Sequence, residues 1–237
     1  MITNLSNYEN KTTNLINKMD SNKFDETIHS DIYTYRFPDG QTGQLLKLLA
    51  NHTEGSDTTN TKLFIKEHLK LLTQNIKEVE YSNRPTASHF PFEIDVATGE
   101  KHYTDEFCWS RGDLITLILL YKADKVFGET LNEFIANTIG AIVAQRRTLL
   151  AVNDNPFIRT GTAGIALCFK ILHRLSGKSF YGEAESYWLS ETKRQKAKNN
   201  VESSTNSLLD GYMGVNLVLS SMELKSTKSE LEHLLMK

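Results

Sequence analysis

Two glycines spaced three residues apart open a long apolar run at residues 159–172, RTGTAGIALCFKIL. Its apolar residues recur at intervals of three and four, the period of an α-helix, and the run is apolar on almost every side. Gly177 follows at the place where a left-handed cap would end such a helix. The stretch therefore predicts a helix that is enclosed by other helices.

The same opening recurs along the chain. A Gly-x-x-Gly pair precedes apolar residues at Gly40–Gly43 and at Gly211–Gly214, and Gly112 stands alone before a fourth apolar run. The later openings recur at intervals of about 50 residues, which is typical of a structural repeat. Glycine at a helix start allows a close approach to a neighbour. Because each helix pair buries its face only against the next pair, we expect a mainly α protein built as an α/α solenoid or ring.

Amphipathic segments alternate with the apolar ones. Phe64–Val79 and Leu131–Val143 each carry apolar residues at helical spacing, and Thr130 is the expected N-cap of the second. A more polar helix is expected around Glu183–Lys198, and a last apolar helix over Leu209–Met222. The pattern predicts inner helices that are buried and outer helices that have one exposed face.

One segment breaks the helical pattern. Near residues 90–103, Phe92, Ile94 and Val96 alternate with polar residues, and Ala97-Thr98-Gly99-Glu100 is typical of a turn. This alternation predicts one small β-hairpin inserted between helices.

The composition of the chain limits how it can be divided into domains and which classes of protein it can belong to. Residues 1–30 are polar and predict a loosely ordered N-terminal segment, which leaves residues 31–237 as a single repeat domain. The formal net charge of −2 gives no electrostatic case for a nucleic-acid partner, which would call for a basic face. The longest apolar run, Leu114–Tyr121, is shorter than the roughly 20 residues that cross a bilayer. With no secretory signal and only two cysteines, we expect a cytoplasmic protein.

These helix starts resemble those of the lanthionine synthetase C-like family. The most specific match is Trp109-Ser110-Arg111-Gly112-Asp113, which is similar to the family's Trp-Cys-x-Gly-Asp motif. Residues 159–164 stand where the family has Cys-His-Gly-x-x-Gly, and residues 208–214 and 38–40 resemble two further inner-helix starts. The resemblance covers most of residues 30–225. It implies an α/α toroid, partial or complete, whose relatives add a cysteine thiol to a dehydrated serine or threonine in a peptide.

The resemblance also implies a zinc ion, which this chain is not equipped to bind. The family's two cysteines and one histidine correspond here to Ser110, Arg159 and Thr160. A hydroxyl is a poor zinc ligand and an arginine adds a fixed positive charge, so we expect no metal and no other cofactor. The family's acid/base histidine corresponds to Asp39, which is only a weak catalytic candidate.

Polar and aromatic residues at the helix starts are the candidates for ligand binding. They are Trp109, Arg111, Asp113, Arg159, Asp210 and Tyr212. Arg159 opposes the helix dipole, so it should pair with Asp39 or Asp210 or hold an acidic group of a ligand. For Asp113 and Asp210 the plainer interpretation is helix capping and loop solvation. For the two aromatic residues it is core packing.

The two cysteines allow a further alternative. Cys108 lies two residues before a family ligand position, and with His89 and His102 it would form a relocated metal site, although the spacing matches no standard motif. Cys168 lies on an apolar face and is expected to be a core thiol.

Three functional hypotheses follow from the resemblance. The first is a metal-free member, associated with peptide modification, that binds a peptide or a modifying-enzyme partner without cyclising it. The second is a thioether cyclase that uses a non-standard site or is completed by a second subunit. The third is a non-catalytic scaffold. Because the chain carries roughly four inner-helix starts, the ring is open, completed by another chain, or closed by self-association.

Overall fold

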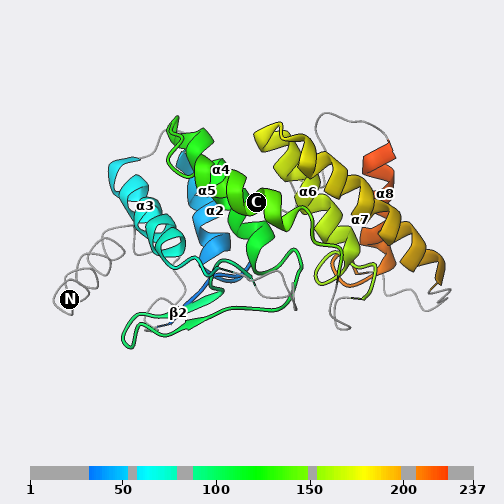
Figure 1. Cartoon of the computed structure of the whole chain (residues 1–237), viewed down its shortest axis with the longest axis horizontal. Coiled ribbons are helices and arrows are strands. Elements are labelled where there is room, and N and C mark those ends of the chain that lie inside the picture. Colours follow the sequence, from blue (N-terminus) through cyan, green and yellow to red (C-terminus); the bar gives the residue numbers. More distant parts are fainter. Residues whose placement is uncertain (1–31, 53–57, 79–87, 149–153, 199–206, 224–237) are drawn as a thin grey trace.

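The computed structural model describes residues 32–52, 58–78, 88–148, 154–198 and 207–223. The polar segment predicted for residues 1–30 lies outside these ranges. Within them the chain is mainly helical, with seven helices and one small three-stranded antiparallel sheet. The helices stand side by side in two layers, and the sheet lies at one end of them (Figure 1).

Four helices form an inner row. They are α2 (Gln41–His52), α4 (Asp113–Phe127), α6 (Thr162–Ser176) and α8 (Tyr212–Glu223). Helix α4 packs against α2 and α6, and α6 also packs against α8. The side chains of α4 are buried on almost every side over its first three turns, as its apolar sequence predicts.

Three helices form the outer layer. They are α3 (Thr58–Gln74), α5 (Glu133–Val143) and α7 (Ser179–Lys198). Helix α3 packs on α2 and α4, α5 on α4 and α7, and α7 on α6 and α8. The predicted alternation of inner and outer helices is confirmed for this part of the chain. None of the helices described is long and apolar enough to cross a bilayer.

Of two predicted helix-end residues, Gly177 is confirmed and Thr130 is wrong. Helix α6 ends at Gly177, whose φ of 69° and N–H bond to the His173 carbonyl make the expected left-handed cap. The prediction of Thr130 as the N-cap of α5 is wrong, because the helix begins at Glu133 after Asn132. Asn132 is held by the Asp124 carboxylate of α4, which accepts its backbone N–H at 2.9 Å and its side-chain amide at 2.7 Å. A neighbouring helix, not a local residue, thus fixes this helix start.

The predicted hairpin is confirmed and gains a third strand. Strands β2 (Glu93–Asp95) and β3 (Lys101–His102) pair antiparallel across the expected turn. Strand β1 (Ile32–Thr34), which the sequence analysis missed, pairs with β2. An isolated bridge between Arg36 and Arg111 then continues the pairing to the start of α4. The sheet therefore joins the beginnings of α2 and α4.

A buried histidine joins α3 to the segment around β1. The His68 ring packs against Tyr33 and Phe64, with ring centroids 5.0 and 4.6 Å away. Its Nδ1 lies 3.0 Å from the Tyr35 hydroxyl. Burial lowers the pKa of His68 from 6.5 to about 4, because a protonated ring would lose its hydration in this apolar setting. His68 is therefore neutral at pH 7.

Candidate functional site

One backbone hydrogen bond recurs at the starts of the inner helices. The Phe37 N–H donates to the Ser110 carbonyl at 2.7 Å and joins the starts of α2 and α4. The Ile158 N–H donates to the Leu209 carbonyl at 3.1 Å and joins the starts of α6 and α8. In both bonds the donor stands three residues before its first glycine and the acceptor two residues before the next helix's first glycine. The α2–α4 and α6–α8 pairs thus share the register that was read from the glycines.

The second glycine of each Gly-x-x-Gly pair is required by close packing. A methyl group added at Gly43, Gly164 or Gly214 would overlap the backbone carbonyl oxygen of the turn that leads into its own helix. At Gly164 the same methyl group would also lie 2.9 Å from the Cβ of Trp109, which precedes α4. The α4 and α6 starts are therefore in contact as well. All four inner helices thus begin on the same side of the layer that they form.

This arrangement brings together the polar residues that precede the first glycines. Asp39, Arg111, Thr160 and Asp210 each stand directly before that glycine, and Arg159 stands one residue earlier. Asp39 and Asp210 are exposed, and the other three are partly buried. We call these five residues the helix-start surface. It carries both signs of charge and comes from four separate segments of the chain.

Arg159 forms an ion pair within this surface. Its Nε donates to both carboxylate oxygens of Asp210, at 2.9 and 3.0 Å. Of the two partners expected for Arg159, the structure therefore selects Asp210. The two side chains are 40% and 51% exposed, so the pair contributes at most about 1 kcal/mol to stability. An acidic ligand could compete for Arg159 at little cost to the fold.

Arg111 is held from two sides. Its Nε lies 3.3 Å from the Glu106 carboxylate, and its backbone forms the bridge to Arg36. The side chain is one-third exposed. Arg111 thus presents a partly neutralised positive charge beside α4.

Asp113 lies beneath the surface and has a structural role. Its carboxylate is 1% exposed and accepts the backbone N–H groups of His89 and Phe90 at 2.8 and 3.1 Å. The His89 ring Nδ1 lies 3.1 Å from the same carboxylate. Asp113 stands in the first turn of α4 as expected, but it is buried, so the interpretation as loop solvation is wrong. It anchors the segment before the hairpin to α4.

The two aromatic candidates differ in their surroundings. Trp109 is 1% exposed and packs edge-to-face on Phe37 at 4.8 Å, so it belongs to the core. Tyr212 is partly buried and meets the Phe157 ring edge-to-face at 5.6 Å. Only Tyr212 keeps part of its surface at the helix starts.

The residues at the family's zinc positions do not fit a zinc ion. The buried Ser110 hydroxyl lies 3.4 Å from the Cys108 thiol, the Thr160 hydroxyl accepts from the Asn155 amide at 3.2 Å, and Arg159 is a cation in an ion pair. Zinc requires thiolate, imidazole or carboxylate ligands, and none of the three positions supplies one.

The relocated metal site is not assembled either. His89 faces Asp113, whereas His102 is an exposed residue of β3 beside Glu100. Burial raises the pKa of the Cys108 thiol, which disfavours the thiolate that a metal would need. Within the described ranges, no three His, Cys, Asp or Glu side chains are grouped to hold a metal. Cys168 is buried in α6 as predicted.

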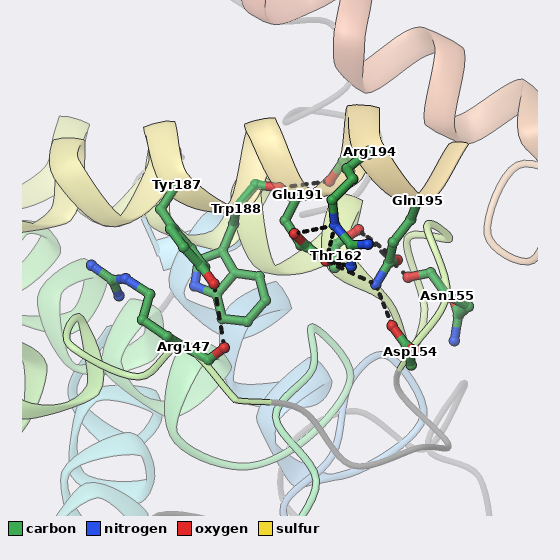
Figure 2. Close-up of polar contacts among 10 residues, drawn as sticks. Arg147, Asp154, Asn155, Thr162, Tyr187, Trp188, Glu191, Arg194 and Gln195 are labelled. Carbon is green, nitrogen blue, oxygen red and sulfur yellow. Dashed lines mark hydrogen bonds and ion pairs between the residues drawn. The ribbon is translucent and has the colours of Figure 1, made fainter. Parts of the chain in front are cut away.

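A second polar cluster links α7 to the start of α6 (Figure 2). The buried Gln195 amide donates to Asp154 at 2.6 Å, and its oxygen accepts from the Thr162 hydroxyl at 3.3 Å. Glu191, one turn before Gln195, forms an ion pair with Arg194. The sequence analysis missed this cluster, although Gln195 continues the buried face of α7 at helical spacing from Trp188. The cluster holds the connection before α6 and needs no ligand to explain it.

Comparison with protein-family models, with curated proteins and with solved structures found no match to this chain.

Proposed function

We propose that this chain is a lanthionine synthetase C-like α/α repeat protein that binds an acidic peptide segment at the helix-start surface without cyclising it. The observation that carries the proposal is the ion pair between Arg159 and Asp210. By the sequence resemblance Arg159 corresponds to a metal-ligand position of that family, and its ion pair is exposed enough to exchange.

The chemistry of the surface favours binding over catalysis. Arg159 can offer a planar, two-pronged donor to a carboxylate, which is a geometry suited to acidic groups. Arg111 adds a second positive charge that is only partly neutralised by Glu106. Asp39 is an exposed carboxyl group of the same surface. The proposal therefore assigns no catalytic residue.

A binding measurement on charge variants tests the proposal. The probe is a fluorescent synthetic peptide that carries a cysteine, a dehydrated serine and two glutamates. Arg159→Ala should weaken binding by about tenfold, the scale of one charge-assisted hydrogen bond. Asp210→Asn should strengthen binding, because it removes the internal competitor for Arg159.

Arg194→Ala provides the matched control. Arg194 also forms an ion pair, with Glu191 of α7, but it is exposed and lies outside the helix-start surface. Its loss should leave the affinity unchanged. Absence of binding, or equal affinity for the Arg159 and Asp210 variants and the wild type, would refute the proposal.

The same samples separate binding from cyclisation. Thioether closure consumes the peptide thiol without a change in mass, so alkylation of the free thiol reports it. The proposal expects the thiol to stay fully alkylable after incubation with the protein. Its progressive loss, dependent on the protein, would support the cyclase hypothesis instead.

A further inference from the structure

Two arginines face each other where the segment before α2 meets the segment before α4. Arg36 and Arg111 are opposite residues of the isolated antiparallel bridge. Because the Phe37 N–H bonds the Ser110 carbonyl beside them, they form a non-hydrogen-bonded pair, in which the Cα atoms are about 4.5 Å apart and the side chains lie closest. Tyr35 and Phe37 are buried, whereas Arg36 between them is exposed and Arg111 is one-third exposed. The two arginine side chains therefore lie on the solvent side of the bridge.

The guanidinium groups of this pair have unused hydrogen-bond donors. Several other arginines each donate at least one hydrogen bond, namely Arg146, Arg147, Arg159 and Arg194. The Arg36 side chain has neither a hydrogen bond nor an ion pair within the described ranges. The Nε of Arg111 is buried without a hydrogen bond, since the Glu106 carboxylate at 3.3 Å is an ion-pair contact only. The pair thus presents donors that no neighbouring acceptor satisfies.

Two facing positive charges are also electrostatically unfavourable. Like charges directly opposite each other on paired strands are destabilising. Glu106 offsets one of the two charges. Asp39 lies in the turn closed by the Gly40 N–H bond to the Arg36 carbonyl, but its carboxylate is exposed and forms no ion pair with a described residue. An anion that contacts both guanidinium groups would supply the acceptors and remove the repulsion.

We infer that the Arg36–Arg111 pair binds a second carboxylate of the acidic peptide, while Arg159 binds the first. The inference rests on the proposed function and extends it from one acidic group to two. A carboxylate accepts two parallel hydrogen bonds, and arginine offers donors in the matching planar geometry. Glu106 and Asp39 keep two negative charges beside the pair, so a singly charged carboxylate suits it better than a doubly charged phosphate.

The two contacts lie close enough for one peptide to reach both. Arg111 directly precedes the first glycine of α4, and Arg159 stands two residues before the first glycine of α6. Helices α4 and α6 pack together, and the axes of packed helices are about 8–10 Å apart. An extended peptide advances about 3.4 Å per residue, so two glutamates four residues apart span about 14 Å and point to the same side. This spacing covers the distance between the two helix starts.

Fluorescence anisotropy on the full chain tests the second contact with three labelled synthetic peptides. One carries two glutamates four residues apart, and in each of the others one of these glutamates is replaced by glutamine. For the wild type, either replacement should weaken binding by about tenfold. Arg36→Ala should bind the two-glutamate peptide about tenfold more weakly than the wild type does, and one of the two replacements should then have no further effect. In Arg159→Ala the other replacement should lose its effect.

The controls separate this inference from the proposed function. Arg36→Ala removes a charge opposite Arg111, so its urea midpoint should be no lower than that of the wild type; a lower midpoint would count against the repulsion between them. Arg194→Ala should again leave all three affinities unchanged. If Arg159→Ala weakens binding and Arg36→Ala does not, or if both replacements keep their full effect in Arg36→Ala, the second contact is refuted and the proposed function stands. Failure of all three peptides to bind the wild type would overturn both.

Discussion

Acidification from pH 7 to pH 5 should weaken the fold through His68. The folded pKa of this ring is about 4, against 6.5 for an exposed histidine. The unfolded chain therefore takes up a proton as the pH falls below 6.5, whereas the folded chain resists it until about pH 4. Stability contributed by the neutral ring is fully present above pH 6.5 and falls progressively between these values.

The size of the effect follows from the two pKa values. Each unit of separation corresponds to about 1.4 kcal/mol, so the loss approaches about 3 kcal/mol below pH 4 and reaches about 2 kcal/mol at pH 5. This is a large part of the stability of a typical domain. The lower figure is the useful one, because most carboxyl groups are still ionised at pH 5.

Urea unfolding at the two pH values measures this loss. His68→Gln keeps a polar side chain near Tyr35 and removes the titration, so the variant should lose about 2 kcal/mol less than the wild type between pH 7 and pH 5. His102→Gln makes the same substitution at an exposed histidine of β3 and should behave like the wild type. Equal losses in the wild type and in His68→Gln would refute the reasoning, whatever the absolute stabilities.

Three further outcomes are expected. Gly164→Ala should lower the free energy of unfolding, measured in urea, by at least about 2 kcal/mol, because its methyl group would overlap a fixed backbone carbonyl. Gly182→Ala should be tolerated, because its methyl group would meet a partly exposed histidine ring. Asp113→Ala should lower the free energy of unfolding by about 3 kcal/mol, because it leaves buried N–H groups without acceptors. Asp210→Ala should lower it by at most about 1 kcal/mol, because that ion pair is exposed. Equal losses in the two variants would contradict the structural role of Asp113. Both cysteine thiols are buried and burial raises their pKa values, so they should react with a thiol reagent only slowly in the folded protein and rapidly in urea.

The glycine register was predictable because its cause is local. A Gly-x-x-Gly pair followed by apolar residues reports a helix start that packs closely on its own preceding turn, and the short alternating run before Gly99 reports a hairpin. Both signals lie within a few residues of the structure that they specify. They were sufficient to place the inner helices and the β2–β3 pair.

The remaining features depend on partners that are distant in sequence. Strand β1 is three residues long and is fixed by β2. The start of α5 depends on Asp124 of α4, and the buried role of Asp113 depends on the segment at His89. No local pattern distinguishes a capping aspartate from one that anchors a loop. For Arg159 the sequence offered two partners, and only the tertiary contact between the α6 and α8 starts selects Asp210.

The bond that recurs at the inner-helix starts uses only main-chain atoms. Any residue with a backbone N–H can donate at positions 37 and 158, and any residue can accept at 110 and 209, so these bonds do not depend on side-chain chemistry. Residues 39, 111, 160 and 210, which stand directly before the first glycines, lie beside these main-chain bonds. The bonds do not depend on the side chains at those four positions. These four residues could be randomised together, as antibody loops are, to select new binding specificities on one end of an unchanged helical support.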